Sequence, residues 1–309
     1  MTLIQPPLMV TGGTHPARAL RMMIRDLSRG SQGITEGGDL RVRSTATPGA
    51  AVRVGNGSAI VRGSVFGQGS YTQYNAGDHI VPIAPTGGTG RSDLLCLRVE
   101  DPEYEGNRNP ATEDIGYFHV LPGVSANATA PPPGMTAIPL ARITLPPNCA
   151  TVTDAMVTDL RQLANPRRER RVRVIGGFPY SPIGSQVGVW QSTWPTGANV
   201  SFDVPIWATS ASVVTSLHGL RFSGEVFIGF RQVIAGVIGN EAQMDTDGIT
   251  TFSRGDITMI DTFGWKPEQR GTVQTLTVQA GRYNTSPGNI DVNGNTTMVT
   301  DVDFVEGVY

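Results

Sequence analysis

The sequence predicts a mainly β protein of two domains. Glycine and proline are abundant, with 38 and 22 residues in a chain of 309, while charged residues make up only 16%. This composition favours short strands and turns over helix bundles. Apolar residues recur with a period of two through much of the chain, which is typical of strands with one buried face. A chain of this length also commonly forms more than one domain.

The first domain is expected over residues 1–164, opening with a proline- and glycine-rich N-terminal arm. A helix is predicted from Pro16 to Ser28, because proline suits a first helical turn and Leu20 and Leu27 belong to one apolar stripe. Three arginines on another face are candidates for docking onto an acidic ring of a neighbouring subunit: Arg18, Arg21 and Arg25. The same pattern is also explained if this face of the helix is simply exposed to solvent.

Strands with turn residues between them follow in this domain. Asn56-Gly57 is a strong hairpin signal, and the near-continuous apolar run from Asp93 to Val99 indicates a strand buried on both faces. Further strands are predicted near Leu40–Val42, Val52–Val54, His79–Ile83, Tyr117–Leu121 and Pro139–Leu145. The domain is therefore predicted as a β-rich body with a short helix near each end.

The second of these helices is predicted from Asp154 to Ala164. The spacing of its apolar residues places them on one helical face, and Asn165-Pro166 stops the helix. These apolar residues are Met156, Val157, Leu160 and Leu163.

An arginine-rich linker is predicted over residues 165–176. It holds Arg167, Arg168, Arg170, Arg171 and Arg173. The cluster has Glu169 in its middle and no interleaved aromatic residue, and the net charge of the chain is −2, so nucleic-acid binding is not expected. We expect the first four arginines to neutralise carboxylates of the adjoining domain or of a neighbouring subunit.

The second domain, residues 177–309, is predicted to be an all-β sandwich of jelly-roll type. Apolar residues alternate with polar ones from Val200 to Ile206, from Leu276 to Ala280 and from Met298 to Phe304. No helical period occurs after Gly176. Strands with intervening turns over about 130 residues match the size of one sandwich.

Catalytic and metal-binding chemistry is not expected. The four histidines are scattered, and no nucleophile elbow, zinc motif or phosphate loop is present. Asn289-x-Asp291-x-Asn293-Gly294 has the opening rhythm of a calcium loop but lacks its closing glutamate, and it also fits a hairpin turn. No cofactor is therefore predicted. Cys96 and Cys149 are expected to be buried or half-buried free thiols.

Aromatic residues of the second domain are the candidate ligand surface. They are Trp190, Trp194, Trp265 and Tyr283. Aromatic rings on loops favour stacking on flat apolar faces, including those of sugars. The alternative is that these rings plug the ends of the sandwich, since large aromatic side chains are mostly buried. No secretory signal or membrane-spanning segment is expected.

Four segments of the first half also resemble a known family. They are Asp39–Val42, Val54–Gly63, Arg91–Asp101 and the segment from Leu140 to Arg161, with the pattern LARITL followed by VTDAMVTDLR. In this order they resemble the minor tail and baseplate proteins of long-tailed phages of actinobacteria, over roughly residues 16–165. The resemblance implies a virion protein at the tail tip, made in the host cytoplasm and associated with other tail proteins.

Three functions remain open from the sequence. The first is a tail-tip adhesion protein, in which residues 1–164 attach to the tail and residues 177–309 bind a host cell-wall glycan. Such a protein is expected to form homo-oligomers, trimers by analogy with other tail-tip proteins, so that multivalency strengthens weak single sites. The second is a cell-wall polysaccharide hydrolase, and the third is a purely structural tail protein.

Overall fold

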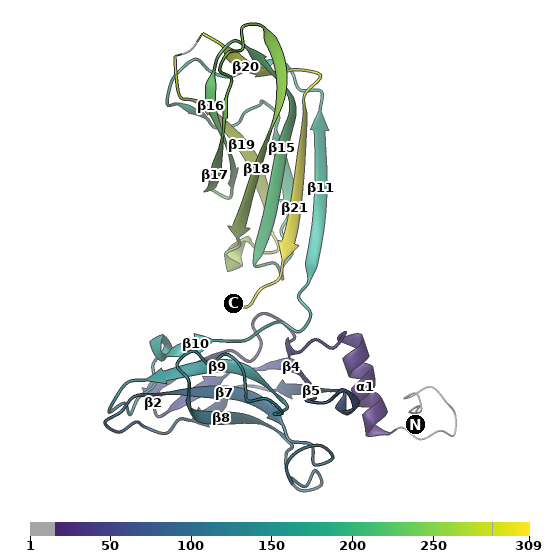
Figure 1. The fold of residues 1–309 in the computed structure, drawn as a ribbon, viewed down its shortest axis with the longest axis vertical. Helices are drawn as coiled ribbons and strands as arrows, with labels where there is room; N and C mark the ends of the chain where they lie inside the picture. Colours follow the sequence, from purple (N-terminus) through teal and green to yellow (C-terminus); the bar gives the residue numbers. More distant parts are fainter. Residues whose placement is uncertain (1–15, 286) are drawn as a thin grey trace. The chain divides into compact units, whose positions relative to one another are not determined.

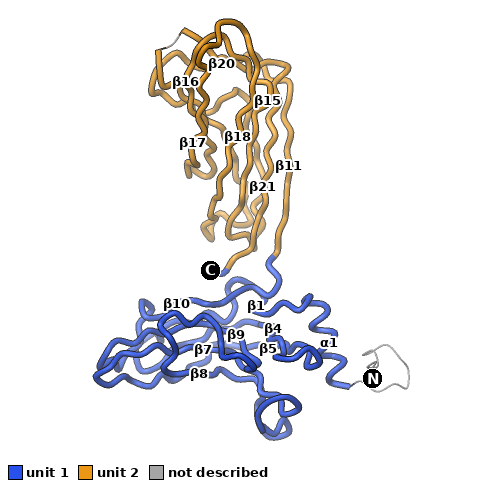
Figure 2. The backbone as a smooth tube through the Cα atoms, in the orientation of Figure 1, with its two compact units in different colours: residues 1–166, 308–309 blue, residues 167–307 orange. Residues whose placement is uncertain are grey.

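The computed structural model describes residues 16–285 and 287–309, which divide into two compact units (Figure 2). Unit 1 comprises residues up to Pro166 together with Val308–Tyr309, and unit 2 comprises Arg167–Gly307. The expected N-terminal arm, residues 1–15, lies outside the described residues. The protein is mainly β, as the composition and the period of two predict.

Unit 1 begins with the predicted helix, α1 (Ala17–Leu27), which contacts strand β5 and the short helix η1 (Figure 1). Pro16 occupies the N-cap with extended backbone, so its missing N–H costs the helix no hydrogen bond. Ala19 is the buried residue of α1.

Three small sheets build the rest of unit 1. The first has the order β1 (Gly33–Ile34), β4 (Gly57–Arg62), β5 (Ser70–Asn75), and the second β2 (Val42–Gly49), β3 (Ala51–Val54), β6 (His79–Pro82). The third has the order β10 (Val157–Asp159), β9 (Ala137–Leu145), β7 (Arg91–Val99), β8 (Gly116–Val124). The short helix η1 (Phe66–Gln68) joins β4 to β5.

Strand β7 is buried on both faces, as its apolar run predicts. Leu95 and Leu97 join the main core of unit 1, whereas Leu94 and Cys96 belong to a smaller cluster on the other face. Burial raises the pKa of the Cys96 thiol to about 12, so the thiol stays protonated at neutral pH. Cys96 and Cys149 are both free and buried, which confirms the expectation from the sequence.

The α-helix predicted from Asp154 to Ala164 is wrong. This segment forms the short 3-10 helix η2 (Asp154–Met156) and the edge strand β10, which pairs antiparallel with β9. Further along, the N–H of Ala164 donates to the carbonyl of Ile34 at 2.9 Å. Pairing with distant strands satisfies the backbone groups that the predicted helix would have bonded internally.

Unit 2 is a sandwich of two antiparallel sheets, and the chain passes from one sheet to the other several times (Figure 1). One sheet contains β11 (Arg168–Gly176), β21 (Thr297–Val305), β15 (Ser210–Ser223) and β18 (Phe252–Gly264), with β20 (Asn289–Val292) and β12 (Ser181–Pro182) beyond the end of β21. The other contains β14 (Asn199–Asp203) and β13 (Trp190–Gln191) beside β19 (Val273–Arg282), then β16 (Phe227–Ile234) and β17 (Val237–Asp245). A short helix, η3 (Pro267–Gln269), precedes β19.

This strand order is that of a jelly roll. The first long strand, β11, pairs with the last strand, β21. The consecutive strands β15 and β16 lie in opposite sheets. Inward-facing residues such as Leu217, Phe230 and Phe304 fill a single core between the sheets. The sandwich expected from the alternating pattern is confirmed.

The arginine-rich segment is not a linker, because residues 168–176 form strand β11 of unit 2. Four of the five arginines form ion pairs within this unit: Arg167 with Glu306 at 2.7 Å, Arg168 with Asp303, Arg170 with Asp301, and Arg171 with Glu169. A hydrogen bond from Arg170 holds the pKa of Asp301 below its usual value. The carboxylates that these arginines neutralise therefore come largely from the neighbouring strand β21 and the residue that follows it.

A polar cluster closes one side of the sandwich. Asp261 on β18 accepts a hydrogen bond from the backbone N–H of Asn240 on β17 at 2.6 Å, and another from its side chain at 2.9 Å. Asp261 is only 5% exposed. It therefore joins the edge strands of the two sheets through hydrogen bonds in a dry environment, where an unmade bond is costly.

Candidate functional site

Two of the four aromatic residues expected to form a ligand surface lie in the core of unit 2. Trp194 is fully buried and packs against Phe230 with ring centroids 5.7 Å apart. Trp265 is 5% exposed and packs between Phe202 and Phe304. The expectation that Trp194 and Trp265 form a ligand surface is wrong, because their rings fill the sandwich interior.

The other two aromatic residues do lie together, on the outer face of the sheet formed by β13, β19, β16 and β17. The rings of Trp190 and Tyr283 meet edge to face, with centroids 6.3 Å apart. Phe227 packs against Tyr283 at 5.0 Å. Tyr283 is 36% exposed, and Trp190 is half-buried. Both side chains are therefore accessible from solvent at one place.

Glycines form the floor beneath the Trp190 ring. In the sheet register Trp190 lies opposite Gly281, which lies opposite Gly229 on the next strand. A β-carbon at either glycine would come within 2.9 Å of the indole. Glycine at both positions thus lets the ring lie flat on the sheet, in line with the use of strand glycines where another group approaches closely.

Charged and amide side chains surround the two rings. The Arg231 guanidinium stacks on the Trp190 ring, 3.9 Å from its centroid, and donates to the side-chain oxygen of Gln279 at 2.8 Å. Gln243 donates to Glu241 at 2.9 Å. We call this arrangement the Trp190 surface, which consists of Trp190, Phe227, Arg231, Glu241, Gln243, Gln279 and Tyr283.

The tyrosine of this surface is held in its protonated form. Desolvation, followed by a hydrogen bond to Glu241, raises the pKa of Tyr283 to about 12. The Tyr283 hydroxyl is thus a donor at any physiological pH, while Glu241 supplies an acceptor. Flat rings beside fixed donors and acceptors suit a ligand that has both apolar faces and hydroxyl groups, as sugars do.

Five members of this surface were not expected from the sequence: Phe227, Arg231, Glu241, Gln243 and Gln279. They lie on three strands that meet only in the folded sheet, so neither spacing nor local pattern joins them. One local signal was present, namely a glycine inside each of two otherwise regular strands, at Gly229 and Gly281.

The helix arginines expected to dock a neighbouring subunit have contacts within unit 1. Arg18 donates to the carbonyl of Gly67 at 2.7 Å, and Arg21 donates to that of Gln68 at 2.9 Å. Arg21 also pairs with Asp101 at 3.3 Å and with Glu103 at 2.6 Å. Both arginines therefore fasten α1 to the rest of unit 1.

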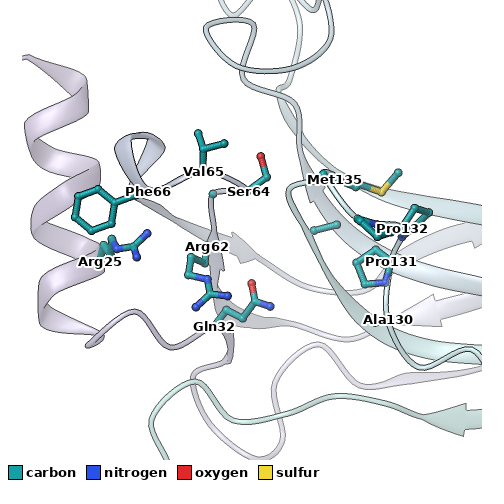
Figure 3. Close-up of a pocket in the computed structure, with 14 residues that line it drawn as sticks. Arg25, Gln32, Arg62, Ser64, Val65, Phe66, Ala130, Pro131, Pro132 and Met135 are labelled. Carbon is teal, nitrogen blue, oxygen red and sulfur yellow. The ribbon is translucent and has the colours of Figure 1, made fainter.

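Arg25 differs from these two arginines, because it lines an open groove of about 500 Å³ in unit 1 (Figure 3). Its guanidinium stacks on Phe66, 4.4 Å from the ring centroid. Arg25 and Phe66 form one side of the groove, the proline-rich segment 130–135 forms the other, and Arg62 and Gln32 lie between them (Figure 3). We call this the Arg25 groove.

Metal-ligating groups do not come together in the described part of the chain. No cluster of three or more histidine, cysteine or acidic side chains suitable for a metal is found among residues 16–285 and 287–309. The calcium-like segment forms strand β20 instead, and Asp291 is bound by Arg221 at 3.0 Å. Asn293-Gly294 is not a hairpin turn, because β20 and β21 both pair with β15.

None of the helices in the described residues has the length and apolarity that crossing a bilayer requires.

Comparison with known proteins adds little to these observations. No protein-family model matches the chain, and no curated protein matches it. Similar solved structures include the infectious bursal disease virus Gx strain (12% identity, 91% of this chain and 72% of that chain, TM-score 0.26) and the VP2 subviral particle of the same virus (12% identity, 90% and 78%, TM-score 0.26). Latent PorU from Porphyromonas gingivalis also matches (10% identity, 94% and 26%, TM-score 0.27). Similarity this low carries no argument about function, which rests on the residues themselves.

Proposed function

We propose that this protein is a structural component of a virion, located at the tail tip or baseplate of a phage, and that unit 2 binds a glycan of the host cell wall. The observation that carries the binding proposal is the Trp190 surface, where two partly exposed rings, one of them stacked by Arg231, lie beside polar groups on the outer face of a sheet. The resemblance of residues 16–165 to minor tail proteins supports the location.

In this proposal unit 1 attaches the protein to other tail proteins, and copies of the chain associate as a homo-oligomer, most simply a trimer. A shallow surface of this kind binds a single sugar weakly. Several copies presented together raise the overall affinity by the effective concentration of the linked sites. Association of copies therefore allows individually weak glycan sites to hold a virion on a cell.

The protein acts by binding and not by turnover. Hydrolysis of a polysaccharide by the usual route requires two carboxyl groups facing each other across the substrate. Within the Trp190 surface Glu241 is the carboxylate, and it is already hydrogen-bonded to Gln243 and Tyr283. These contacts favour a role in orienting the neighbouring side chains.

The test is sedimentation of the full-length protein with purified actinobacterial cell walls, with released sugar assayed in the same tube. We expect the protein to bind walls and release no sugar, and we expect Trp190→Ala and Tyr283→Ala to weaken binding at least about tenfold, the loss of one good stacking contact. Phe252→Ala is the matched control, because Phe252 is a 69% exposed ring stacked by Arg221 in the other sheet.

Each alternative function predicts a different result. Sugar release that depends on the wall substrate would establish a hydrolase and overturn the binding proposal. Absence of wall binding by the folded oligomer would favour a purely structural tail protein. If Phe252→Ala and Trp190→Ala lose equal affinity for cell walls, binding does not depend specifically on the Trp190 surface.

A further inference from the structure

The Arg25 groove carries positive charge without an acidic counterpart. Its lining includes Arg25 and Arg62 and no aspartate or glutamate. Neither arginine forms an ion pair within the described residues, where Arg62 donates to the carbonyl of Gly30 at 3.2 Å and Arg25 stacks on Phe66. By contrast, the nearby Arg21 is paired with two carboxylates. The groove is therefore complementary to a segment that brings its own carboxylates.

The lining also contains exposed apolar residues, beside the polar Gln32 and Ser64. Phe66 is 71% exposed and Val65 is 52% exposed. Opposite them lie Pro131, Pro132 and Met135 (Figure 3). A ring, a proline run and two cations suit a short segment that combines small apolar residues with acidic ones.

The rim of the groove is fixed before any ligand arrives. The carbonyl of Gly67 accepts hydrogen bonds from Arg18 at 2.7 Å and from the Tyr104 hydroxyl at 3.1 Å. Gln68 is fully buried, and its amide donates to Tyr71 and to Thr136, both at 3.1 Å. Because η1 is held at both of these residues, binding at Phe66 costs little ordering of the backbone.

A loop of the same unit has the complementary chemistry. Residues 109–114, with the sequence NPATED, are exposed and carry Pro110, Ala111, Glu113 and Asp114. The connection between β7 and β8 that contains them projects away from the sheets (Figure 1). Its own hydrogen bonds shape it: Glu113 accepts from the N–H of Asn109 at 2.8 Å, and Asn109 accepts from Ala111 at 3.0 Å.

The base of this loop is rigid as well. Glu100 contacts Arg98 at 3.6 Å and Arg108 at 3.7 Å, and Arg108 stacks on Tyr117 at 3.9 Å. The loop therefore presents its two neighbouring carboxylates on a fixed stem. Association of two pre-formed surfaces loses less conformational entropy than association of flexible ones.

We propose that the Arg25 groove of one copy binds the acidic loop 109–114 of a second copy, with Arg25 and Arg62 facing Glu113 and Asp114. Because groove and loop are different surfaces of the same unit, the contact is heterologous, and repetition of it closes a ring when the rotation between copies allows. This inference names the contact behind the self-association included in the proposed function, and it does not depend on glycan binding by unit 2.

The test is sedimentation velocity of the full-length protein over a wide concentration range. We expect Arg25→Glu/Arg62→Glu and Glu113→Lys/Asp114→Lys each to raise the dissociation constant of self-association at least about tenfold. The chain that carries all four changes should regain association, because both sides of every contact are then reversed. Arg43→Glu/Arg173→Glu is the matched control, with two exposed arginines outside the groove.

Circular dichroism shows whether each variant is folded, and the milder Arg25→Gln/Arg62→Gln replaces the reversal if it is not. Unchanged association in both reversed variants overturns the inference while leaving the self-association of the proposed function intact. If the variant that carries all four changes does not regain association, the loop 109–114 is not what the Arg25 groove binds, and the result points to another acidic partner. A wild-type protein that stays monomeric overturns both this inference and the self-association of the proposed function.

Discussion

The amide nitrogen of Gln232 donates a hydrogen bond to the carboxylate of Asp261 at 2.8 Å, across the interior of the C-terminal sandwich. Gln232 lies on β16 in one sheet and Asp261 on β18 in the other, and Gln232 is fully buried. The oxygen of the same Gln232 amide accepts from Thr215 at 2.7 Å. A continuous polar chain thus links the two sheets through a core that is otherwise apolar.

Removal of this carboxylate should destabilise unit 2. Asp261→Ala leaves the N–H of Asn240 and one donor of Gln232 without their acceptor, which predicts a loss of about 2–4 kcal/mol in the free energy of unfolding. Urea denaturation followed by tryptophan fluorescence measures it, because all four tryptophans lie in unit 2. Asp256→Ala, at an exposed position of the same strand, should cost less than about 1 kcal/mol. Equal effects of the two changes would contradict the role given to Asp261.

A β-carbon beneath Trp190 should lift its ring from the sheet. Gly281→Ala places a methyl group 2.9 Å from the indole Cδ2 atom, too close for the ring to stay flat. We expect a more solvent-exposed tryptophan emission and a loss of wall binding similar to that of Trp190→Ala. Gly264→Ala is the control, because nothing lies within 4 Å of a β-carbon there. Retention of wall binding by a folded Gly281→Ala protein would argue against a flat ring as the binding element.

The phenol of Tyr283 should ionise late. Desolvation and the hydrogen bond to Glu241 raise its pKa to about 12, above the ordinary value of about 10. Because the folded-state pKa is raised, the stabilising contribution of the protonated phenol is complete below about pH 10 and disappears as the pH rises through about 12. The difference in tyrosinate absorbance between wild type and Tyr283→Phe reports this titration.

Replacement of Glu241, the hydrogen-bond acceptor of Tyr283, tests the cause of the raised pKa. Glu241→Gln removes the negative charge beside the phenol and should lower the pKa of Tyr283, whereas Glu268→Gln, at an exposed position elsewhere in unit 2, should leave it unchanged. An unaltered titration of Tyr283 in Glu241→Gln would mean that the charge of Glu241 does not raise the pKa of Tyr283.

Loss of Arg21 should loosen α1. The side chains of Arg21 and Asp101 are only 13% and 10% exposed, so Arg21→Ala leaves a poorly solvated carboxylate without its cation. We expect a cost of about 2–3 kcal/mol and faster hydrogen exchange over residues 17–27. Arg25→Ala, which removes an exposed stacking contact with Phe66, should cost less than about 1 kcal/mol. Unchanged exchange in Arg21→Ala would show that other contacts hold the helix.

Features that depend on local sequence were predictable. The stripe after Pro16 predicts α1, and the apolar run in β7 predicts a strand buried on both faces. The alternating pattern in the second half predicts the sandwich, because a period of two fixes which residues face the core whatever the partner strand is.

Features that depend on strand partners were not predictable in the same way. The stripe from Met156 to Leu163 fits a helix, yet Val157 and Leu163 pack on the main core of unit 1 while Leu160 packs on the smaller cluster. The arginine-rich segment suggested a linker because the carboxylates that pair with Arg167, Arg168 and Arg170 are 131 to 139 residues away in sequence. Trp190 and Trp194 both flank a turn-like segment, and only the glycines opposite Trp190 distinguish the surface ring from the core ring.

Unit 2 begins at Arg167 and ends at Gly307, and its two ends lie together: the N–H of Glu306 donates to the carbonyl of Arg167 at 3.0 Å. The chain then returns to unit 1, where the N–H of Tyr309 donates to Gly37 at 3.1 Å. The sandwich thus has adjacent ends, an arrangement in which domain insertion is tolerated. A different module with equally close ends can replace unit 2 without rerouting the chain of unit 1, so recombination can exchange one unit while the other is preserved.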